Sequence, residues 1–394
     1  MKIAIFSTGD LSDFKGVMNY VHEKSIRFRN VNNTELKSDL FFLVTKYIGV
    51  LGLIKRLKGE RTQYKDGDKL DINGLTYNIV VQERDIFDIL ASVICGRFIS
   101  SNNIKKIGKI FENYDIISAH QLTCQYIACK IKKNTGKPFI ATWHGSDINV
   151  SPRKSKRNYE VTKLVMESAE QNYFVSKALM VASDYISKGA RKNHIYTGPS
   201  SIFYKYSEKE RLRLRRENNV EGATVITFSG NLIDIKNVLV LPGVFKRLNE
   251  KLHDYKLAFW IIGNGYLGDE LKKRLIETGV NFKMFGKIEA SKMPDYMNCT
   301  DILILPSLNE GFPLSILEAR ACGSHVVASK VGGLPESAGE KNCFQLGADF
   351  EESISNRMAE IILMDEDIDP LPEEYSWESA INKEVAEINE ILNK

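Results

Sequence analysis

Short apolar runs alternate with amphipathic stretches through the first half of the chain. The runs are rich in Ile, Val, Phe and Tyr, which is typical of buried strands, and helical patterns separate several of them. Strands are therefore predicted at 2–7, 77–81, 114–119, 138–143 and 172–176. Because strands that alternate with helices are typical of βαβ units, we expect this half to form a parallel sheet.

A second series of apolar runs follows a pause in the pattern at "GPSSIFYKY" (198–206). Its strands are predicted at 225–230, 257–263, 281–286, 301–306, 325–330 and 343–346. Six strands with helices between them predict a doubly wound α/β domain, in which ligands bind beyond the carboxyl ends of the strands. The predicted organisation is two domains, 1–200 and 201–375, followed by an amphipathic terminal helix at 376–394.

One apolar segment, residues 40–59, does not fit this alternation. Its sequence, "LFFLVTKYIGVLGLIKRLKG", is interrupted by Lys46 and contains Lys55 and Arg56, so it is too short and too charged for a transmembrane helix. A partly buried helix is predicted, and a basic helix lying on a membrane surface is the alternative. The polar stretch 60–75 is predicted to form a loop and turns.

Basic residues are concentrated in the first half. Residues 1–200 contain 31 Lys and Arg against 19 Asp and Glu, a net charge of +12, whereas the remainder carries −8. This asymmetry indicates that the first half faces anionic material. A charged helix within 207–218 is expected to face solvent.

Cysteine spacing and the first residues bear on the compartment. The six cysteines form no C-x-x-C pair and no metal-ligand spacing, so buried thiols in a reducing cytosol are expected. "MKIAIFSTGD" lacks the layout of a signal peptide, which favours a cytoplasmic protein. No nucleic-acid-binding motif accompanies the basic runs, so no nucleic-acid partner is expected.

The stretch "ILILPSLNEGFPLSILEA" (302–319) carries the most specific chemistry. A buried strand, a Gly-Phe-Pro turn and a helix follow one another, so the backbone amides after Glu310 would lie at a helix N-terminus, which suits phosphate. Glu310 and Glu318 could accept hydrogen bonds from polyols on either side of that phosphate. A ribose, a diphosphate and a sugar would fit this arrangement. The alternative for Glu318 is a capping box with Ser315.

This segment resembles the E-x7-E motif of the retaining family-4 glycosyltransferases. That family has the GT-B architecture, in which two Rossmann-like domains face each other and a C-terminal helix crosses back to the N-terminal domain. The resemblance implies that 1–200 binds the acceptor and 201–375 binds the nucleotide-sugar. Glu310 would contact the donor sugar and Glu318 the ribose. The sugar and diphosphate would lie against the intervening backbone of Gly311, Phe312, Pro313, Leu314 and Ser315.

Other segments of the second domain extend the resemblance. In "FSGNLIDIKNV", Lys236 matches the family lysine on the donor diphosphate, where it would stabilise the charge that grows on the leaving phosphate. Asn231 stands where the family has an arginine, so one positive charge is missing. Gly263 belongs to a family G-x-G turn, which also fits the dinucleotide fingerprint G-x-G-x-x-G. Ile288 follows the next strand and is expected to approach the nucleobase through its main chain.

The first domain supplies further candidates by the same resemblance. Gly16 lies at a turn before a helix and is expected to approach the donor phosphate, although Lys15 replaces the first of two family glycines. "ATWHGSDIN" resembles the family segment H-G-x-D, whose histidine faces the transferred sugar. His144 is therefore assigned as catalytic together with Glu310 and Lys236. His120, at the end of another strand, and Asp147 are candidates for the acceptor side, and either histidine could instead be structural.

The predicted activity is transfer of a hexose-type sugar, with retention, from a nucleoside-diphosphate sugar to an acceptor hydroxyl in cell-surface glycan or polysaccharide biosynthesis. No DxD-type cluster demands a metal, so neither a metal nor another cofactor is expected, and a UDP-sugar is favoured over a GDP-sugar. A glycan or lipid-linked acceptor is the expected partner, and contact with the inner face of a membrane is left open. Three alternatives also stay open: a donor-binding but non-catalytic protein, a nucleotide-sugar epimerase, and a dinucleotide-binding oxidoreductase.

Overall fold

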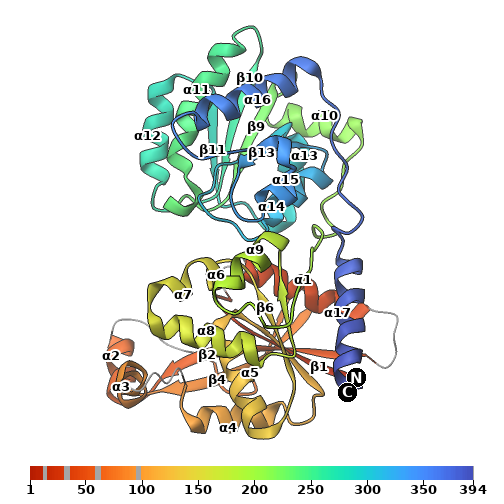
Figure 1. Cartoon of the computed structure of the whole chain (residues 1–394). Helices are drawn as coiled ribbons and strands as arrows, with labels where there is room; N and C mark the ends of the chain where they lie inside the picture. The colour runs from red at the N-terminus through yellow and green to blue at the C-terminus, as the bar shows by residue number, and fades with distance from the viewer. Residues whose placement is uncertain (12–15, 31–35, 58–63, 95–98, 394) are drawn as a thin grey trace. The chain divides into compact units, whose positions relative to one another are not determined.

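The computed structural model describes residues 1–11, 16–30, 36–57, 64–94 and 99–393. The chain forms two compact units (Figure 1). The first comprises Met1–Tyr196 with Trp377–Lys394, and the second comprises Thr197–Ser376. Each unit is built around its own sheet and is described separately.

The first unit contains an eight-stranded sheet in the order β3-β4-β2-β1-β5-β6-β7-β8. β3 pairs antiparallel with β4, and the other neighbours are parallel. The strand order reverses between β1 and β5, so the carboxyl ends of these two strands mark the switch point of this sheet. The strands are β1 (Lys2–Thr8), β2 (Lys37–Tyr47), β3 (Lys69–Ile72), β4 (Leu75–Arg84), β5 (Ile116–His120), β6 (Phe139–Trp143), β7 (Gln171–Phe174) and β8 (Lys192–His194).

Helices connect these strands, and the last helix of the chain belongs to this unit. α17 lies beside α1, on which it packs (Figure 1). The helices are α1 (Val17–Asn30), α2 (Gly49–Leu57), α3 (Ile86–Ile94), α4 (Ser101–Ile110), α5 (Gln121–Thr135), α6 (Ser146–Asn149), α7 (Ser151–Lys154), α8 (Lys156–Ser168), α9 (Lys177–Ala182), the 3-10 turn η1 (Ser183–Tyr185) and α17 (Trp377–Leu392).

The prediction of a helix across 40–59 is wrong. The first part of the segment is β2, which lies between β1 and β4 with Leu40, Phe42 and Leu43 fully buried, and only the part after Gly49 is helical. An apolar run without a period fits a central strand as well as a buried helix, and its aromatic and β-branched residues favour the strand. The predicted loop at 60–75 is also wrong in part, because β3 occupies its last residues. Residues 58–63 lie outside the described part of the chain.

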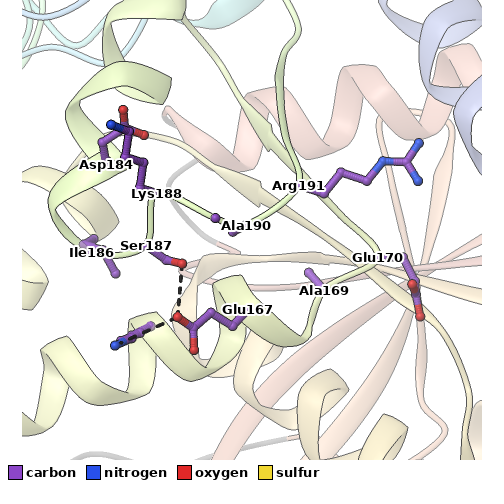
Figure 2. A pocket seen from close by; sticks show the side chains of 11 residues that line it. Glu167, Ala169, Glu170, Asp184, Ile186, Ser187, Lys188, Ala190 and Arg191 are labelled. Atoms are coloured by element: carbon purple, nitrogen blue, oxygen red, sulfur yellow. Dashed lines mark hydrogen bonds and ion pairs between the residues drawn. The ribbon is translucent and has the colours of Figure 1, made fainter.

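An open pocket of about 720 Å³ lies where α8 ends and where β7 and β8 begin. Figure 2 shows Glu167 in this pocket, where it accepts a hydrogen bond from Ser187 Oγ at 3.1 Å. The lining charges have both signs, from Lys163, Glu167, Glu170, Asp184, Lys188 and Arg191. Because the pocket borders the amino ends of parallel strands, it lies at the edge of the sheet opposite the switch point.

The second unit contains a six-stranded parallel sheet in the order β11-β10-β9-β12-β13-β14. This is the doubly wound order, with the reversal between β9 and β12, and it confirms the prediction from the sequence. The strands are β9 (Thr224–Ser229), β10 (Leu257–Ile262), β11 (Phe282–Gly286), β12 (Ile302–Leu305), β13 (His325–Ser329) and β14 (Cys343–Phe344).

Alternate residues of the central strands enter two separate hydrophobic clusters of this unit. Ile226 and Phe259 belong to one cluster, and their neighbours Val225 and Trp260 belong to the other, as expected for a sheet with helices on both faces. The helices are α10 (Glu208–Glu217), α11 (Leu241–Lys251), α12 (Gly268–Thr278), α13 (Met293–Cys299), α14 (Leu314–Ala321), α15 (Leu334–Ala338) and α16 (Phe350–Met364), with 3-10 turns η2 (Asp234–Lys236), η3 (Val238–Val240), η4 (Ala290–Lys292) and η5 (Glu340–Asn342).

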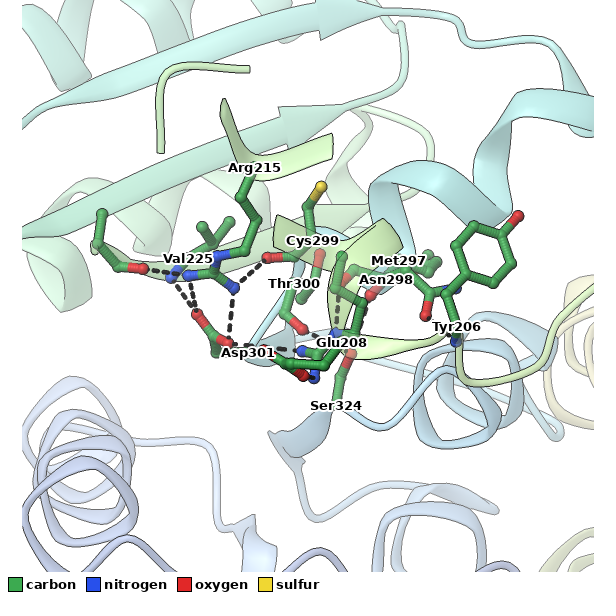
Figure 3. Close-up of polar contacts among 12 residues, drawn as sticks. Tyr206, Glu208, Arg215, Val225, Met297, Asn298, Cys299, Thr300, Asp301 and Ser324 are labelled. Carbon is green, nitrogen blue, oxygen red and sulfur yellow. Dashed lines mark hydrogen bonds and ion pairs between the residues drawn. The ribbon is translucent and has the colours of Figure 1, made fainter. Parts of the chain in front are cut away.

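The charged helix α10 does not simply face solvent as predicted. The Arg215 guanidinium makes two parallel bonds to the Asp301 carboxylate, at 2.9 and 3.0 Å, and a third to the carbonyl of Cys299 (Figure 3). Asp301 also accepts the amide of Val225 at 2.8 Å. Bidentate pairs of this kind are strong and directional, so the cluster anchors α10 to the amino edge of β9 and β12.

Candidate active site

The switch point of the second sheet brings together the two segments that the sequence assigned to the donor. β9 and β12 are neighbours, and the chain leaves both strands at the same edge. Residues 230–236 follow β9, and residues 306–313 follow β12 and lead into α14. In doubly wound sheets, ligands bind at this position.

Lys236 and Glu310 form an ion pair at this edge. Lys236 Nζ contacts Glu310 Oε1, which also accepts a hydrogen bond from Ser307 Oγ at 2.8 Å. The side chains are 21% and 12% exposed, so the pair is largely withdrawn from water but remains accessible. Both donors fix the Glu310 carboxylate at the end of β12, with the lysine charge directly beside it.

The turn after Glu310 leads directly into a helix N-terminus. Gly311 and Pro313 are buried, and the Phe312 ring packs edge-on against Tyr375 with centroids 5.4 Å apart. Pro313 is the residue before α14, and no side chain caps the helix, so the predicted alternative of a Ser315–Glu318 capping box is wrong. Ile316 N already donates to the Pro313 carbonyl at 3.2 Å, so the amides of Leu314 and Ser315 are the ones that a bound anion would use.

The positions of Leu314, Ser315 and Glu318 follow from this start. Leu314 and Ser315 are the first two residues of α14, and Glu318 lies one turn further along. Ile316, Leu317 and Ala319 are fully buried around it, which leaves the partly exposed Glu318 on the other side of the helix.

A glycine turn after β13 packs against the backbone of Glu310. Gly332 has φ +51°, and a methyl group there would lie 1.9 Å from the Glu310 carbonyl oxygen. Gly333 N donates to that same oxygen at 3.3 Å. Only glycine permits this approach, so the turn between β13 and α15 holds the backbone of Glu310 in place.

The G-x-G turn after β10 has a similar structural explanation. A methyl group on Gly263 would lie 1.9 Å from the carbonyl oxygen of Gly230, and one on Gly265 would lie 2.1 Å from that of Leu232. These glycines therefore serve the backbone-to-backbone packing of the loops after β9 and β10, which explains them without a dinucleotide. Asn231 lies in the loop after β9, between Gly230 and Leu232, and Ile288 lies partly exposed in the loop after β11.

In the first unit, a tight turn presents His144 at the end of β6. Gly145 has φ +135°, and Asp147 is buried with its carboxylate turned back on the turn. That carboxylate accepts the amides of His144, at 3.0 and 3.1 Å, and of Gly145 at 2.8 Å. Burial raises the pKa of Asp147, and these backbone bonds oppose the rise. The contacts give Asp147 a structural task, which is to hold the turn that carries His144.

His120 and His144 are linked. His120 Nδ1 lies 3.1 Å from His144 Nε2, and the ring of Tyr20 packs on both histidines. His120 is fully buried at the end of β5, which places it behind His144 and away from an acceptor in solvent. Burial and the nearby Lys24 charge lower the pKa of His144 to about 3, and burial, Lys24 and His144 hold the pKa of His120 well below its usual range. Both rings are therefore neutral at pH 7.

Two charged residues behind these rings, Lys24 and Glu384, are not among the residues predicted from the sequence. Lys24 of α1 forms a 2.7 Å ion pair with Glu384 of α17, and both side chains are almost fully buried. Lys24 Nζ also lies 3.0 Å from Ser118 Oγ and 3.5 Å from His120 Nε2. A sequence signal existed, since Lys24 lies on the apolar face of α1 beside Val21 and Phe28.

Gly16 is the remaining candidate residue of the first unit. Gly16 has φ +49°, and its carbonyl accepts the amide of Tyr20 at 3.1 Å, so it begins the first turn of α1. Lys15 and Cys95 lie outside the described residues.

In the described part of the chain, the other five cysteines are buried thiols, and no group of three or more His, Cys, Asp or Glu side chains is placed to hold a metal ion. No described helix is long and apolar enough to cross a membrane.

Comparison of the sequence with known proteins identifies a matching family and several relatives. Residues 210–373 match the family described as Glycosyl transferases group 1. An uncharacterized glycosyltransferase of Methanocaldococcus jannaschii is 27% identical over 251 residues, which are 61% of this chain and 64% of that protein. A D-inositol 3-phosphate glycosyltransferase of Pseudarthrobacter chlorophenolicus is 24% identical over 236 residues, 56% of each chain. The matched part therefore spans less than two thirds of these curated relatives.

The structural likeness covers the whole chain. The crystal structure of HepE from Anabaena in complex with UDP has a TM-score of 0.72 and 18% identity, and the match covers 99% of this chain and 100% of that one. The two α/β units thus have the fold of GT-B glycosyltransferase structures, as the sequence predicted. The family match thus applies to residues 210–373, and the structural likeness extends to the fold of both units.

Proposed function

We propose that the protein is a retaining glycosyltransferase that transfers a hexose-type sugar from a nucleoside-diphosphate sugar, preferably a UDP-sugar, to an acceptor hydroxyl. The observation that carries the proposal is the Lys236–Glu310 pair at the switch point of the second sheet, next to the uncapped start of α14. Similarity to group 1 glycosyl transferases and to a UDP-bound GT-B structure supports it.

Each residue of the second unit has a separate task in this proposal. Lys236 binds the diphosphate, and the amides between Gly311 and Ser315 bind its oxygens with the positive end of the α14 dipole. Glu310 accepts hydrogen bonds from hydroxyl groups of the sugar, and Glu318 accepts them from the ribose. Asn231 adds hydrogen bonds without a charge, and Ile288 approaches the base through its main chain.

The reaction needs no group from outside the chain and its two substrates. The bond between the sugar C1 and the phosphate oxygen breaks, and a bond from C1 to the acceptor oxygen forms on the same face. The acceptor proton passes to the departing phosphate, so no side chain has to act as nucleophile. Lys236 stabilises the charge on that phosphate, which is the main electrostatic contribution expected of the chain. His144 is proposed to contact the transferred sugar.

Donor binding tests the proposal first. Thermal stabilisation is measured with a panel of nucleotide sugars and free nucleotides, because a ligand that binds the folded state raises its melting temperature. We expect one nucleotide class to stabilise the wild type, and Glu318→Ala to abolish the shift. Glu277→Ala, on the exposed face of α12, is the matched control and should keep it. No shift with any nucleotide would overturn the proposed donor site.

Product analysis then separates the alternatives. A sugar transferred to an acceptor with the anomeric configuration of the donor supports the proposal, and inversion would overturn the retaining mechanism. Donor binding without turnover on any acceptor would favour the non-catalytic alternative. Conversion of the donor in the absence of acceptor would favour an epimerase, and stabilisation by a nicotinamide cofactor alone would favour an oxidoreductase.

We also propose that the first unit contacts an anionic membrane surface through α2 and α3. These helices contact each other and expose large apolar side chains, and Lys55 and Arg56 occupy the last turn of α2. The exposed side chains are Val50, Leu53, Ile54, Leu57, Ile86, Phe87 and Leu90. An apolar surface flanked by basic residues is typical of helices that lie in a membrane interface.

Vesicle flotation tests this contact. We expect the protein to float with vesicles that contain phosphatidylglycerol and much less with neutral ones. Leu57→Ser and Phe87→Ser should each reduce flotation, because these side chains are 81% and 73% exposed. Leu363→Ser, 59% exposed in the second unit, is the control. Equal flotation of all variants, or none of the wild type, would contradict the proposal.

A further inference from the structure

The contacts of Lys24 determine which nitrogens of the buried histidines carry protons. An ammonium group has three N–H donors and no acceptor. Lys24 Nζ has three partners at hydrogen-bond distance, which are Glu384 Oε1 at 2.7 Å, Ser118 Oγ at 3.0 Å and His120 Nε2 at 3.5 Å. Because Lys24 can only donate, His120 Nε2 must accept, and it therefore carries no proton.

The protonation of His120 in turn determines that of His144. A neutral imidazole has one N–H, so the proton of His120 must be on Nδ1. That nitrogen lies 3.1 Å from His144 Nε2, which must accept in turn. His144 consequently has its proton on Nδ1, at the other side of the ring. The tautomer of His144 is thus set through His120 by an ion pair between α1 and α17.

We propose that Lys24, Glu384 and His120 are positioning residues that hold His144 in the Nδ1–H tautomer, so that its ring offers a fixed hydrogen-bond donor to an oxygen of the bound sugar. The tautomer assignment stands on the geometry of the first unit alone. Only the identity of the oxygen rests on the proposed function. His144 is partly exposed, unlike His120, so of the two rings it is the one that a ligand can reach.

The surroundings of the rings favour the neutral forms from several sides. Burial and the charge of Lys24 of α1 act against protonation, and they lower the pKa of both histidines. Tyr20 of α1 packs on both rings and on Trp377 of α17, and Asp147 bonds the backbone of the His144 turn rather than its ring. The Glu384 carboxylate beside Lys24 is engaged in the ion pair.

Nitrogen-15 NMR of histidine-labelled protein tests the assignment without any turnover. Two-bond proton–nitrogen correlations distinguish the two tautomers and the protonated ring, and His120→Asn and His144→Gln assign the signals. We expect both rings of the wild type to be neutral Nδ1–H tautomers from pH 5.5 to 8.5. An Nε2–H tautomer at either ring, or titration of either ring near pH 6.5, would overturn the proposal.

A paired variant tests the role of the ion pair. Lys24→Met alone leaves a buried unpaired carboxylate and can prevent folding, so Lys24→Met/Glu384→Leu is the variant of choice. We expect His120 and His144 to redistribute toward Nε2–H in this variant, with the signal of His22 unchanged. Lys132→Met, which breaks the ion pair with Glu170 in the same unit, should leave all of these signals unchanged. Unchanged tautomers in the paired variant would contradict the proposed lock.

Kinetics separate positioning from a purely structural effect. With the NMR tautomers altered, we expect kcat of the paired variant to fall about tenfold, equivalent to one hydrogen bond, with little change in the donor KM. Unchanged kcat despite an altered tautomer would overturn the proposed donor role of His144. If the protein transfers no sugar at all, the proposed function fails, and the NMR result still decides the tautomer.

Discussion

Lys236 and Glu310, which are 74 residues apart in the chain, form an ion pair at the carboxyl ends of β9 and β12. Each neutralises the other before a donor is present. A diphosphate that binds Lys236 therefore competes with Glu310 for it, and the carboxylate must find other donors. Ser307 already supplies one, at 2.8 Å, and the hydroxyl groups of a sugar would supply more. Free nucleotide and nucleotide-sugar should thus respond differently to changes at this pair.

Glu310→Gln should separate binding from transfer. Loss of the carboxylate removes the competitor of the diphosphate for Lys236, so we expect UDP to bind about three- to tenfold more tightly, the size of one modest electrostatic interaction. Transfer should fall at least about a hundredfold, because the sugar loses a charged acceptor. Calorimetric titration with UDP and initial rates measure the two effects. Glu277→Gln is the control, and weaker UDP binding by Glu310→Gln would contradict the argument.

Lys236→Met should weaken both steps. We expect UDP affinity to fall about tenfold and kcat by about 10²–10³, since a preorganised donor to the leaving phosphate is lost. The variant also leaves the largely buried Glu310 without its counter-ion, which should cost about 1–3 kcal/mol of stability. Thermal unfolding and initial rates check both effects. Lys246→Met, on the exposed face of α11, should change neither, and full activity of Lys236→Met would exclude a role for this lysine.

The donor segments could be predicted because their chemistry is local. A buried run followed by a glycine turn and a helix, as at 302–319, constrains strand, turn and helix over a short distance, and β12 and α14 form there. The strand β2 could not be predicted in this way, because the run around Leu40 has no period and its burial depends on β1 and β4. Its aromatic and β-branched residues favour a strand, but the pairing with β1 and β4 is what decides between strand and helix.

The residues that contact His120 and His144 could be predicted only in part from the sequence. The resemblance of its segment to H-G-x-D points to His144, but Lys24 and Glu384 come from opposite ends of the chain. Their contact depends on α17 packing on α1, which no local pattern predicts. A charged side chain on the apolar face of an amphipathic helix is a usable signal for such a pair, although it does not name the partner.

The stability of the first unit should fall as the pH drops below 6.5. In the unfolded chain, His120 and His144 take up protons near the ordinary pKa of 6.5, whereas the folded unit holds both pKa values lower, that of His144 at about 3. The unfolded state therefore binds more protons over this window, and each histidine contributes a slope of up to about 1.4 kcal/mol per pH unit.

Urea unfolding between pH 7.5 and 5 measures this slope. A Trp260→Phe background leaves Trp143 and Trp377 as fluorescence reporters of the first unit. We expect the slope to decrease in a His144→Gln variant, while the acidic groups common to both proteins cancel in the comparison. An identical slope in the two proteins would show that His144 titrates normally in the folded state.

Asn231→Arg should strengthen donor binding. Asn231 follows Gly230 at the end of β9, in the loop that carries Lys236, and an arginine there would add a charge-assisted bond to the diphosphate. We expect about a tenfold lower Kd for UDP and a higher kcat, with a steeper loss of affinity as salt is added, since a second charge is screened. Asn231→Gln keeps the polarity without the charge and should resemble the wild type. Calorimetry at two salt concentrations measures the Kd for UDP and its dependence on salt. If Asn231→Arg binds UDP no better than the wild type, residue 231 does not reach the phosphates.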